Sequence, residues 1–301
     1  MDLKQKIDIV DTTGLKDFNE HYFKPQKPVI IKGLADNKIA GKRWTIDYFK
    51  QTMGDLEIDV FDNANKKSAS SAFTTPDLKM KFSDYLEVIG KDQKTDLRIF
   101  LFDCFKSNPT LKDEFPCPEI FEGVLDNVGY MFFGGKDTTV RIHYDIDMSN
   151  VLLTHFGGRK KVILIAPEYN DLLYRLPYNT YSLINLDAIN HKKYPALAFV
   201  KGYECVLEHG DSIFMPSGYW HYMTYLEGSF SISYRKLAPS FQSKMKGLVN
   251  IALKMPYDKL MNKVLGSKWL TMKEQIAQRI AIKAVKSLRE LDLNLQEIIK
   301  K

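Results

Sequence analysis

The sequence predicts a mainly β fold, of sandwich or barrel type, with an N-terminal α/β preface and a C-terminal helical extension. Between residues 129 and 235, short runs of β-branched and aromatic residues alternate with Gly and Pro turns, which is typical of sandwiches and barrels. After Pro239 the apolar residues recur at helical spacing, and no further strand pattern is found. We therefore divide the chain into a domain of residues 1–239 and an extension of residues 240–301.

The preface mixes helices and strands. In chain order we expect a helix at residues 14–22, a strand at 27–33, a helix at 44–51, a strand at 56–61, a helix at 81–89 and a strand at 97–102. An irregular, proline-rich passage follows. The strands of the barrel proper are predicted at residues 129–134, 138–144, 151–156, 161–165, 198–206, 212–215, 221–226 and 229–235. The long insertion at 169–193 is interpreted as a lid or substrate loop, or as a cover for a sheet edge.

Two short motifs indicate a metal site. In TTVRIHYD, His143 and Asp145 are two residues apart on a predicted strand, so both project to the same side. In GDSIFMPSGYWH, a Pro/Gly turn delivers His221 at the start of the next strand. Two imidazoles and one carboxylate are the facial ligand set of non-haem Fe(II) oxygenases. A single strand histidine is more often a satisfied core residue, but the coincidence of both motifs favours metal binding.

The chain resembles a known family in these motifs and in GRKKVILIAP at residues 158–167. Over residues 11–239 it is similar to the cupin-like branch of the JmjC oxygenases, which contains the asparaginyl hydroxylase factor inhibiting HIF and the tRNA wybutosine hydroxylase. The resemblance implies a double-stranded β-helix, or jelly roll. It also implies Fe(II) held by His143, Asp145 and His221, with 2-oxoglutarate and O2 as cosubstrates for the hydroxylation of a C–H bond.

The resemblance also suggests residues that bind the cosubstrate. Lys160 matches the family's cosubstrate lysine, and a desolvated cation is the natural partner of the distal carboxylate of 2-oxoglutarate. Asn150 lies near the family's pocket asparagine, and Thr154 is assigned to the same face of its strand. Two positions depart from the family pattern, because Val140 replaces a hydroxyl residue and Phe100 replaces a pocket tyrosine.

Arg141 has the same strand parity as His143, so it should point inward unless the strand twists or bulges. A buried arginine without a partner is costly. We therefore expect Arg141 to help bind an acid, either the cosubstrate carboxylate or an acidic substrate. The alternative is a structural ion pair with a barrel carboxylate such as Asp211 or Glu204. His155 falls at the opposite parity to Asn150 and is expected to be structural.

The C-terminal extension should pack on the barrel or on a second copy, and in several relatives such helices form a homodimer interface. Of the 43 Lys/Arg and 37 Asp/Glu in the chain, residues 241–301 hold 13 and 5, a net charge of +8. Such a tail can attract RNA, although a solvated lysine face on dimerising helices is the commoner explanation. By family analogy a protein side chain is the first substrate class, with a tRNA or other RNA base or a small molecule as alternatives. A non-catalytic cupin-fold binding or scaffold protein is the alternative of another class.

The composition is that of an ordinary globular protein of 301 residues, with 45% hydrophobic residues. The N-terminus lacks the apolar segment of a signal peptide, and no stretch has the length of a membrane span. The cysteines are three and widely spaced, which predicts neither a disulfide framework nor a zinc cluster. We therefore expect a cytoplasmic protein.

Overall fold

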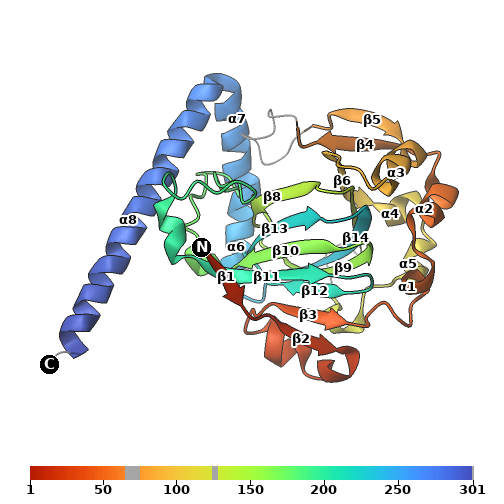
Figure 1. Ribbon diagram of the computed structural model, residues 1–301, viewed down its shortest axis with the longest axis horizontal. Helices are drawn as coiled ribbons and strands as arrows, with labels where there is room; N and C mark the ends of the chain where they lie inside the picture. Colours follow the sequence, from red (N-terminus) through yellow and green to blue (C-terminus); the bar gives the residue numbers. More distant parts are fainter. Residues whose placement is uncertain (65–74, 124–127, 300–301) are drawn as a thin grey trace.

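The computed structural model describes residues 1–64, 75–123 and 128–299. Two β-sheets face each other, and the C-terminal helices lie at one end (Figure 1). The smaller sheet has the order β1 (Asp2–Gln5), β11 (Lys201–Leu207), β10 (Lys160–Ile165), β13 (Trp220–Tyr225), β8 (Thr139–His143). The larger sheet has the order β2 (Asp8–Asp11), β3 (Val29–Lys32), β12 (Ser212–Met215), β9 (Asn150–Gly157), β14 (Ser229–Lys236), β7 (Tyr130–Gly134), β6 (Leu97–Asp103), β4 (Glu57–Asp62), β5 (Leu78–Lys81).

Successive strands from β7 to β14 mostly alternate between the two sheets, which is the winding of a jelly roll. The predicted mainly β fold of the jelly-roll type is therefore confirmed. All eight predicted barrel strands are found, with ends shifted by up to three residues. The largest shift is at β11, because Pro195 begins a 3-10 helix, η6 (Pro195–Phe199), where the strand was expected to start. The sequence reading missed β1, β2 and β5, which are short and largely polar or exposed.

The side chains that face inward from both sheets form the core between them. Alternate residues of β10 illustrate the rule, because Val162 and Leu164 face this core whereas Ile163 and Ile165 pack on the outer face of the smaller sheet. Lys160 has the parity of the inward set. The residues that fill the space between the sheets include Val151, Leu153, Val162, Leu164, Ile213, Met215 and Met223.

The preface covers the outer face of the larger sheet. Its helical segments are η1 (Thr12–Leu15), η2 (Asn19–Phe23), α1 (Ile39–Arg43), α2 (Ile46–Met53), α3 (Phe82–Gly90), α4 (Cys104–Ser107), α5 (Leu111–Glu114) and η4 (Glu119–Phe121). Helix α2 begins after Thr45, whose side chain accepts a hydrogen bond from the Tyr48 amide. Its buried Phe49 packs edge-on against Phe133 of β7 and Phe230 of β14. This aromatic layer supports the two strands behind the cavity described below.

The insertion between β10 and η6 covers the outer face of the smaller sheet. It begins with η5 (Pro167–Tyr169), and Leu173 and Ile184 pack in the same cluster as Ile163 and Trp220. Within it, Tyr181 forms an isolated β-bridge with His143. The insertion therefore covers a sheet face and also reaches the edge of the cavity, and its interpretation as a lid or substrate loop stays a prediction.

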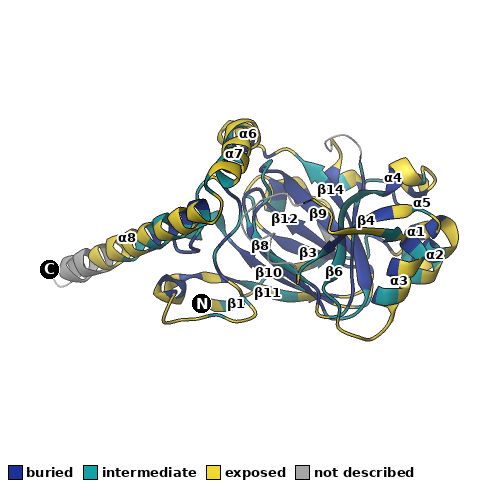
Figure 2. Cartoon of the chain, turned by 90° about the horizontal axis from the view of Figure 1, so that it is seen from above, coloured by how far each residue is buried: buried dark blue, intermediate teal, exposed yellow. Residues whose placement is uncertain are grey.

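The C-terminal extension consists of α6 (Phe241–Val249), the π-helix η7 (Asn250–Lys254), α7 (Met255–Leu265) and α8 (Ser267–Ile299). Gly266, with a φ of 53°, turns the chain between α7 and α8. Ala277 and Ala281 of α8 pack against the insertion cluster. Seen from above, α8 extends away from the sheets (Figure 2). None of the helices in the described ranges has the long apolar run that a membrane crossing requires.

Candidate functional site

His143, Asp145 and His221 meet in space. His143 and His221 are directly paired across β8 and β13, and their ring centroids are 4.2 Å apart. Asp145 follows β8 by two residues. The potential ligand atoms of all three side chains lie within 4.8 Å of one another. The structure therefore brings the predicted metal triad together around one point.

Backbone carbonyls fix the tautomer of both imidazoles. His143 Nδ1 lies 2.8 Å from the Arg141 carbonyl oxygen, and His221 Nδ1 lies 3.2 Å from the Tyr219 carbonyl oxygen. A carbonyl can only accept, so each Nδ1 must carry the proton. Each Nε2 is then left with a free lone pair, which is the state required of a metal ligand.

The electrostatics of the three residues also suit a divalent cation. Burial, together with the neighbouring His221, lowers the pKa of His143 to about 3, and burial lowers the pKa of His221. Burial opposes ionisation of Asp145, but the Arg235 guanidinium and the two imidazoles hold its pKa below the usual value. At neutral pH the site offers two uncharged nitrogens and one carboxylate. This donor set fits Fe(II).

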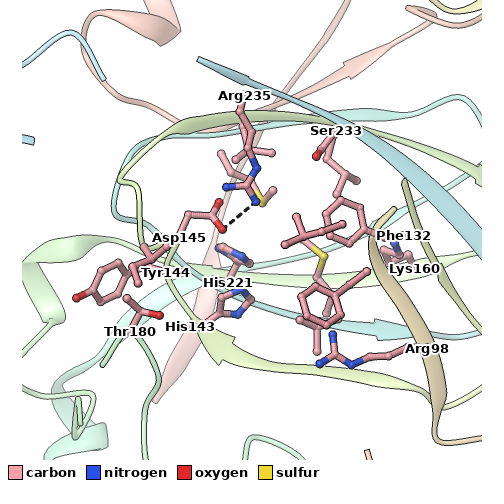
Figure 3. Close-up of a pocket in the computed structure, with 18 of the residues that line it drawn as sticks. Arg98, Phe132, His143, Tyr144, Asp145, Lys160, Thr180, His221, Ser233 and Arg235 are labelled. Atoms are coloured by element: carbon pink, nitrogen blue, oxygen red, sulfur yellow. Dashed lines mark hydrogen bonds and ion pairs between the residues drawn. The ribbon is translucent and has the colours of Figure 1, made fainter. Parts of the chain in front are cut away.

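Arg235, near the end of β14, holds the carboxylate in place. Its Nη2 lies 3.2 Å from Asp145 Oδ1 (Figure 3), and its Nη1 lies 3.4 Å from Asp147 Oδ1. The sequence reading did not single out this arginine, although strand alternation contained the signal. In β14, Phe230, Ile232 and Tyr234 join the outer core. The polar alternates Ser231, Ser233 and Arg235 share the opposite, inward face.

A cavity of about 130 Å³ extends from the triad between the two sheets. An engineered cavity of about 150 Å³ in another protein holds a benzene molecule, so this one has the size for a small ligand. Lys160 lies on the side of the cavity away from Asp145 (Figure 3). The wall between them is largely apolar. It includes Ile99, Phe100, Phe132, Val140, Val151, Leu153, Met215 and Met223.

Lys160 is buried with no acidic partner among the described residues. Only 1% of its surface is exposed. Its Nζ donates to Ser231 Oγ at 2.5 Å and lies 4.0 Å from the centroid of the Tyr225 ring. Burial alone lowers the pKa of Lys160 to about 7. A carboxylate bound here would restore the charged form, so this lysine has the position and the unmet charge of an anion anchor.

His155 supports Lys160 from behind. His155 Nε2 lies 2.7 Å from the Gly158 carbonyl oxygen and must be protonated, so Nδ1 accepts from the Ser231 hydroxyl at 3.0 Å. Ser231 Oγ is thereby oriented to accept from Lys160. Burial and the nearby Lys160 charge hold the pKa of His155 well below its normal value, so the ring is neutral. His155 is absent from the residues that line the cavity, and it acts on the Lys160 anchor only through Ser231.

The structure does not bring Asn150 and Thr154 into the cavity. Asn150 Oδ1 accepts from the Ser217 amide, and its Nδ2 donates to the Leu237 carbonyl oxygen. Thr154 Oγ1 is 2.7 Å from Ser212 Oγ. The inward face of β9 belongs to the odd-numbered residues, such as Val151 and Leu153, so the expected parity of this strand is reversed.

Arg141 is displaced from the cavity wall by a β-bulge. Across from β13, Met223 pairs with Val140 and His221 pairs with His143, so β8 has one extra residue between these pairs. Val140 lines the cavity in place of Arg141. The Arg141 guanidinium instead lies over the Tyr181 ring, 5.2 Å from its centroid.

Neither expected ion pair of Arg141 is formed. Asp211 pairs with Lys32, and Glu204 is exposed on β11. Burial lowers the pKa of Arg141. A second arginine, Arg98 of β6, lines the cavity, and the sequence reading did not single it out. Arg98 is two residues before Phe100 in β6, so both side chains face the cavity. Phe100 is the residue that was compared with the family's pocket tyrosine.

The fold and this site define a jelly-roll protein of the JmjC type. The model of the cupin-like domain family matches residues 15–257, and the chain belongs to this family. Lysine-specific demethylase 8 of Xenopus tropicalis is 25% identical over 78% of this chain and 53% of its own length. The tRNA wybutosine-synthesizing protein 5 of Homo sapiens is 26% identical over 68% of this chain and 70% of its own.

A third relative is the Jumonji C domain-containing protein 5 of Drosophila melanogaster, which is 28% identical over 75% of this chain and 58% of its own length. The chain thus spans little more than half the length of the Xenopus demethylase and of the Drosophila protein. The family resemblance predicted from the motifs is confirmed. The relatives' names refer to different substrates, so they do not assign one to this chain.

Proposed function

We propose that this protein is an Fe(II)- and 2-oxoglutarate-dependent oxygenase that hydroxylates a C–H bond. One observation carries the proposal: a single cavity has two neutral histidines and a carboxylate at one end and, at the other, a buried lysine that has no acidic partner within the described ranges. A metal site alone would fit many cupins. The anion anchor in the same cavity favours a cosubstrate that bears a carboxylate far from the metal.

In this proposal His143, Asp145 and His221 hold the iron, and Lys160 binds the distal carboxylate of 2-oxoglutarate. When bound, iron and its cosubstrates supply the oxidising chemistry, since three protein ligands leave positions for the keto acid and O2. Ser231 orients the Lys160 ammonium group, and Arg235 keeps the Asp145 carboxylate ionised and in place. The apolar wall and the insertion residues Thr180 and Tyr181 exclude water from the cavity.

A protein side chain remains the first substrate class, on the resemblance to the family and on a relative named as a lysine-specific demethylase. An RNA base is the second candidate. It is supported by a relative named for tRNA wybutosine synthesis and by the net charge of +8 in residues 241–301. A small molecule would also fit a cavity of this size. The competing class is a cupin-fold binding protein without turnover.

Anaerobic addition of Fe(II) and 2-oxoglutarate tests the central proposal. We expect a weak visible charge-transfer band, followed by succinate formation when O2 is admitted. His143→Ala should show neither, and His191→Ala, a loop histidine outside the site, is the matched control. Absence of both signals in the wild-type protein would support the binding-protein alternative. Mass spectrometry of lysate proteins and RNA treated with the wild type, but not with His143→Ala, then searches for a product heavier by one oxygen atom.

We further propose that the C-terminal helices form a homodimer interface. Large apolar side chains are exposed on α6 and α7, among them Phe241 (76% exposed), Leu248 and Val264. Light scattering coupled to size exclusion should give twice the mass of one chain. A Phe241→Ser, Leu248→Ser variant should give the mass of one chain, and a wild-type protein that is already monomeric at micromolar concentration would contradict the proposal.

A further inference from the structure

The cavity carries more positive charge than the proposed cosubstrate and metal can balance. Arg98, Lys160 and Arg235 line it, with Arg141 adjacent, and Asp145 is the acid among the residues that line it. Asp147 pairs with Arg235 from outside the wall. A divalent metal and a dianionic keto acid cancel each other. The two aspartates then offset two of the four cations, so two positive charges remain.

These residual charges are located at Arg98 and Arg141. Lys160 and Arg235 belong to the two ends of the cavity that were described above. The distal carboxylate of the proposed cosubstrate meets Lys160, and Asp145 meets Arg235. Neither Arg98 nor Arg141 has an acidic partner in the described part of the chain. The two guanidinium groups are close enough for the charge of Arg98 to act on Arg141 and on His143. Like charges at short range in a half-buried place repel each other.

Both arginines are held in place, and their hydrogen-bonding edges are left free. Arg98 Nε donates to Asn63 Oδ1 at 2.8 Å, and Asn63 Nδ2 donates in turn to the Thr139 carbonyl oxygen. The Arg98 guanidinium also lies over the Phe100 ring, at 4.7 Å. Its two terminal nitrogens have no protein acceptor within the described ranges. This arrangement suits the two-pronged hydrogen bonding that a carboxylate accepts.

Arg141 is linked to the cavity through Tyr181. Its guanidinium lies on the Tyr181 ring, and that ring in turn is stacked on His143 at 5.2 Å. Tyr181 and Arg98 both line the cavity. In Figure 3, the Arg98 side chain extends from the right of the view toward His143, below Lys160. Arg98 therefore presents its guanidinium to the cavity within reach of the metal end, and Arg141 adds its charge from the other side of the wall, at Tyr181.

We propose that Arg98 binds a carboxylate of the substrate, with the positive charge of Arg141 at the Tyr181 ring adding to the attraction, so that the oxygenase acts on an acidic side chain or on a residue next to one. This inference rests on the function proposed above and names the substrate class of the same site. A carboxylate at the end of a side chain can reach a guanidinium inside a narrow cavity. An RNA phosphodiester carries a sugar on both sides and cannot enter to the same depth, so an acidic peptide is favoured over RNA.

The test uses two matched pools of blocked pentapeptides, with Asp or Glu at the centre of one and Asn or Gln at the centre of the other. Binding is measured by ligand-observed NMR on the full chain in the presence of 2-oxoglutarate. We expect the acidic pool to bind roughly tenfold or more tightly than the amide pool, the size of a charge-assisted hydrogen bond. Succinate formation with each pool, under Fe(II) and air, is the second measurement.

The Arg98→Gln, Arg141→Gln variant should bind both pools equally while its affinity for 2-oxoglutarate stays within about twofold. Arg159→Gln, which removes an exposed arginine paired with Glu227, is the matched control and should keep the preference. If the double variant does not fold, Arg98→Lys and Arg141→Gln are compared singly. Arg98→Lys keeps the positive charge but loses the paired N–H donors of the guanidinium. It should therefore lose most of the preference for the acidic pool over the amide pool.

Three results would overturn the proposal: equal binding of the two pools by the wild type, a preference that survives loss of both arginines, or stronger competition by oligouridylate than by the acidic pool. Loss of 2-oxoglutarate affinity in the double variant would instead assign the pair to the cosubstrate. Failure of the proposed function has a different signature. The wild type would then bind no 2-oxoglutarate and form no succinate, whatever its preference among peptides.

Discussion

At the metal end of the cavity, both imidazoles and the carboxylate have hydrogen-bond partners within the protein. At the other end, the partners of Lys160 in the described part of the chain are a hydroxyl group and an aromatic ring. The protein has therefore arranged the first set of groups in advance for binding a cation. It has left the second set electrostatically incomplete. Where buried charge is satisfied internally, the fold specifies geometry, and where it is unsatisfied, a ligand must supply the missing charge.

The largest effect is expected when a ligand at the metal end of the cavity is removed. His221→Ala leaves one imidazole and one carboxylate, and we expect metal-dependent turnover to fall by roughly 1000-fold or more, since even loss of a residue that only supports a ligand costs 10- to 100-fold. Bound iron is measured by a chromogenic chelator after gel filtration, alongside succinate formation. Wild-type iron content in His221→Ala would remove this histidine from the triad.

The second test acts on the incomplete end. Lys160→Met removes the charge but keeps much of the volume, so the affinity for 2-oxoglutarate should fall by about 10- to 150-fold, the range of a charged hydrogen bond. The melting temperature should stay the same or rise, because a buried cation without an acid is lost. Lys161→Met is the matched control, because Lys161 follows Lys160 on β10 and its side chain faces the opposite side of the sheet. A similar loss of affinity in both variants would contradict the assignment.

The third test asks whether the metal end is really arranged in advance. Arg235→Gln removes the guanidinium that fixes Asp145, and metal affinity should fall by about 10- to 100-fold while the binding of 2-oxoglutarate in the absence of metal changes little. Titration with Mn(II), followed by electron paramagnetic resonance, measures the affinity. Arg159→Gln provides a control for loss of an arginine. Unchanged Mn(II) affinity in Arg235→Gln would mean that the contact with Asp145 is incidental.

The smallest expected effect is on pH dependence. Because the pKa of Lys160 is lowered to about 7 by burial, the charged form predominates below this pH and is lost as the pH rises through it. The dissociation constant for 2-oxoglutarate should therefore rise by about twofold from pH 6 to 7 and by up to about tenfold per unit above it. Calorimetry at pH 8 in two buffers should detect proton uptake on binding. A constant affinity from pH 6 to 8 would contradict the lysine anchor.

The parts of the site that could be predicted from sequence depend on short-range geometry. His143 and Asp145 are two residues apart near the end of one strand, and the Pro/Gly turn places His221 at the start of another. Their convergence then followed from the fold. The parity of β9 could not be fixed in this way, because nearly every residue in that strand is buried and both of its faces are apolar. Asn150 and Thr154 were therefore placed on the wrong side of it.

The bulge in β8 is a feature that local patterning does not reveal. Residues 138–144 have no glycine that would mark it, and the extra residue is recognised only against the partner strand β13. Arg141 lost its place in the cavity wall for this reason. Arg98, Ser231 and Arg235 could have been found, since each is a polar residue at alternate positions in a strand that is otherwise apolar, and such a position requires a partner or a ligand.

One strand supports both ends of the cavity. Ser231 contacts Lys160 and Arg235 contacts Asp145, and both belong to β14. Four residues of extended chain separate them, roughly 13 Å at about 3.3 Å per residue. Hydrogen bonds to β7 and β9 on either side keep that interval from stretching. In the proposed function, this fixed interval would set the length of the diacid that can reach from Lys160 to the metal, and the surrounding loops could change the substrate without altering that length.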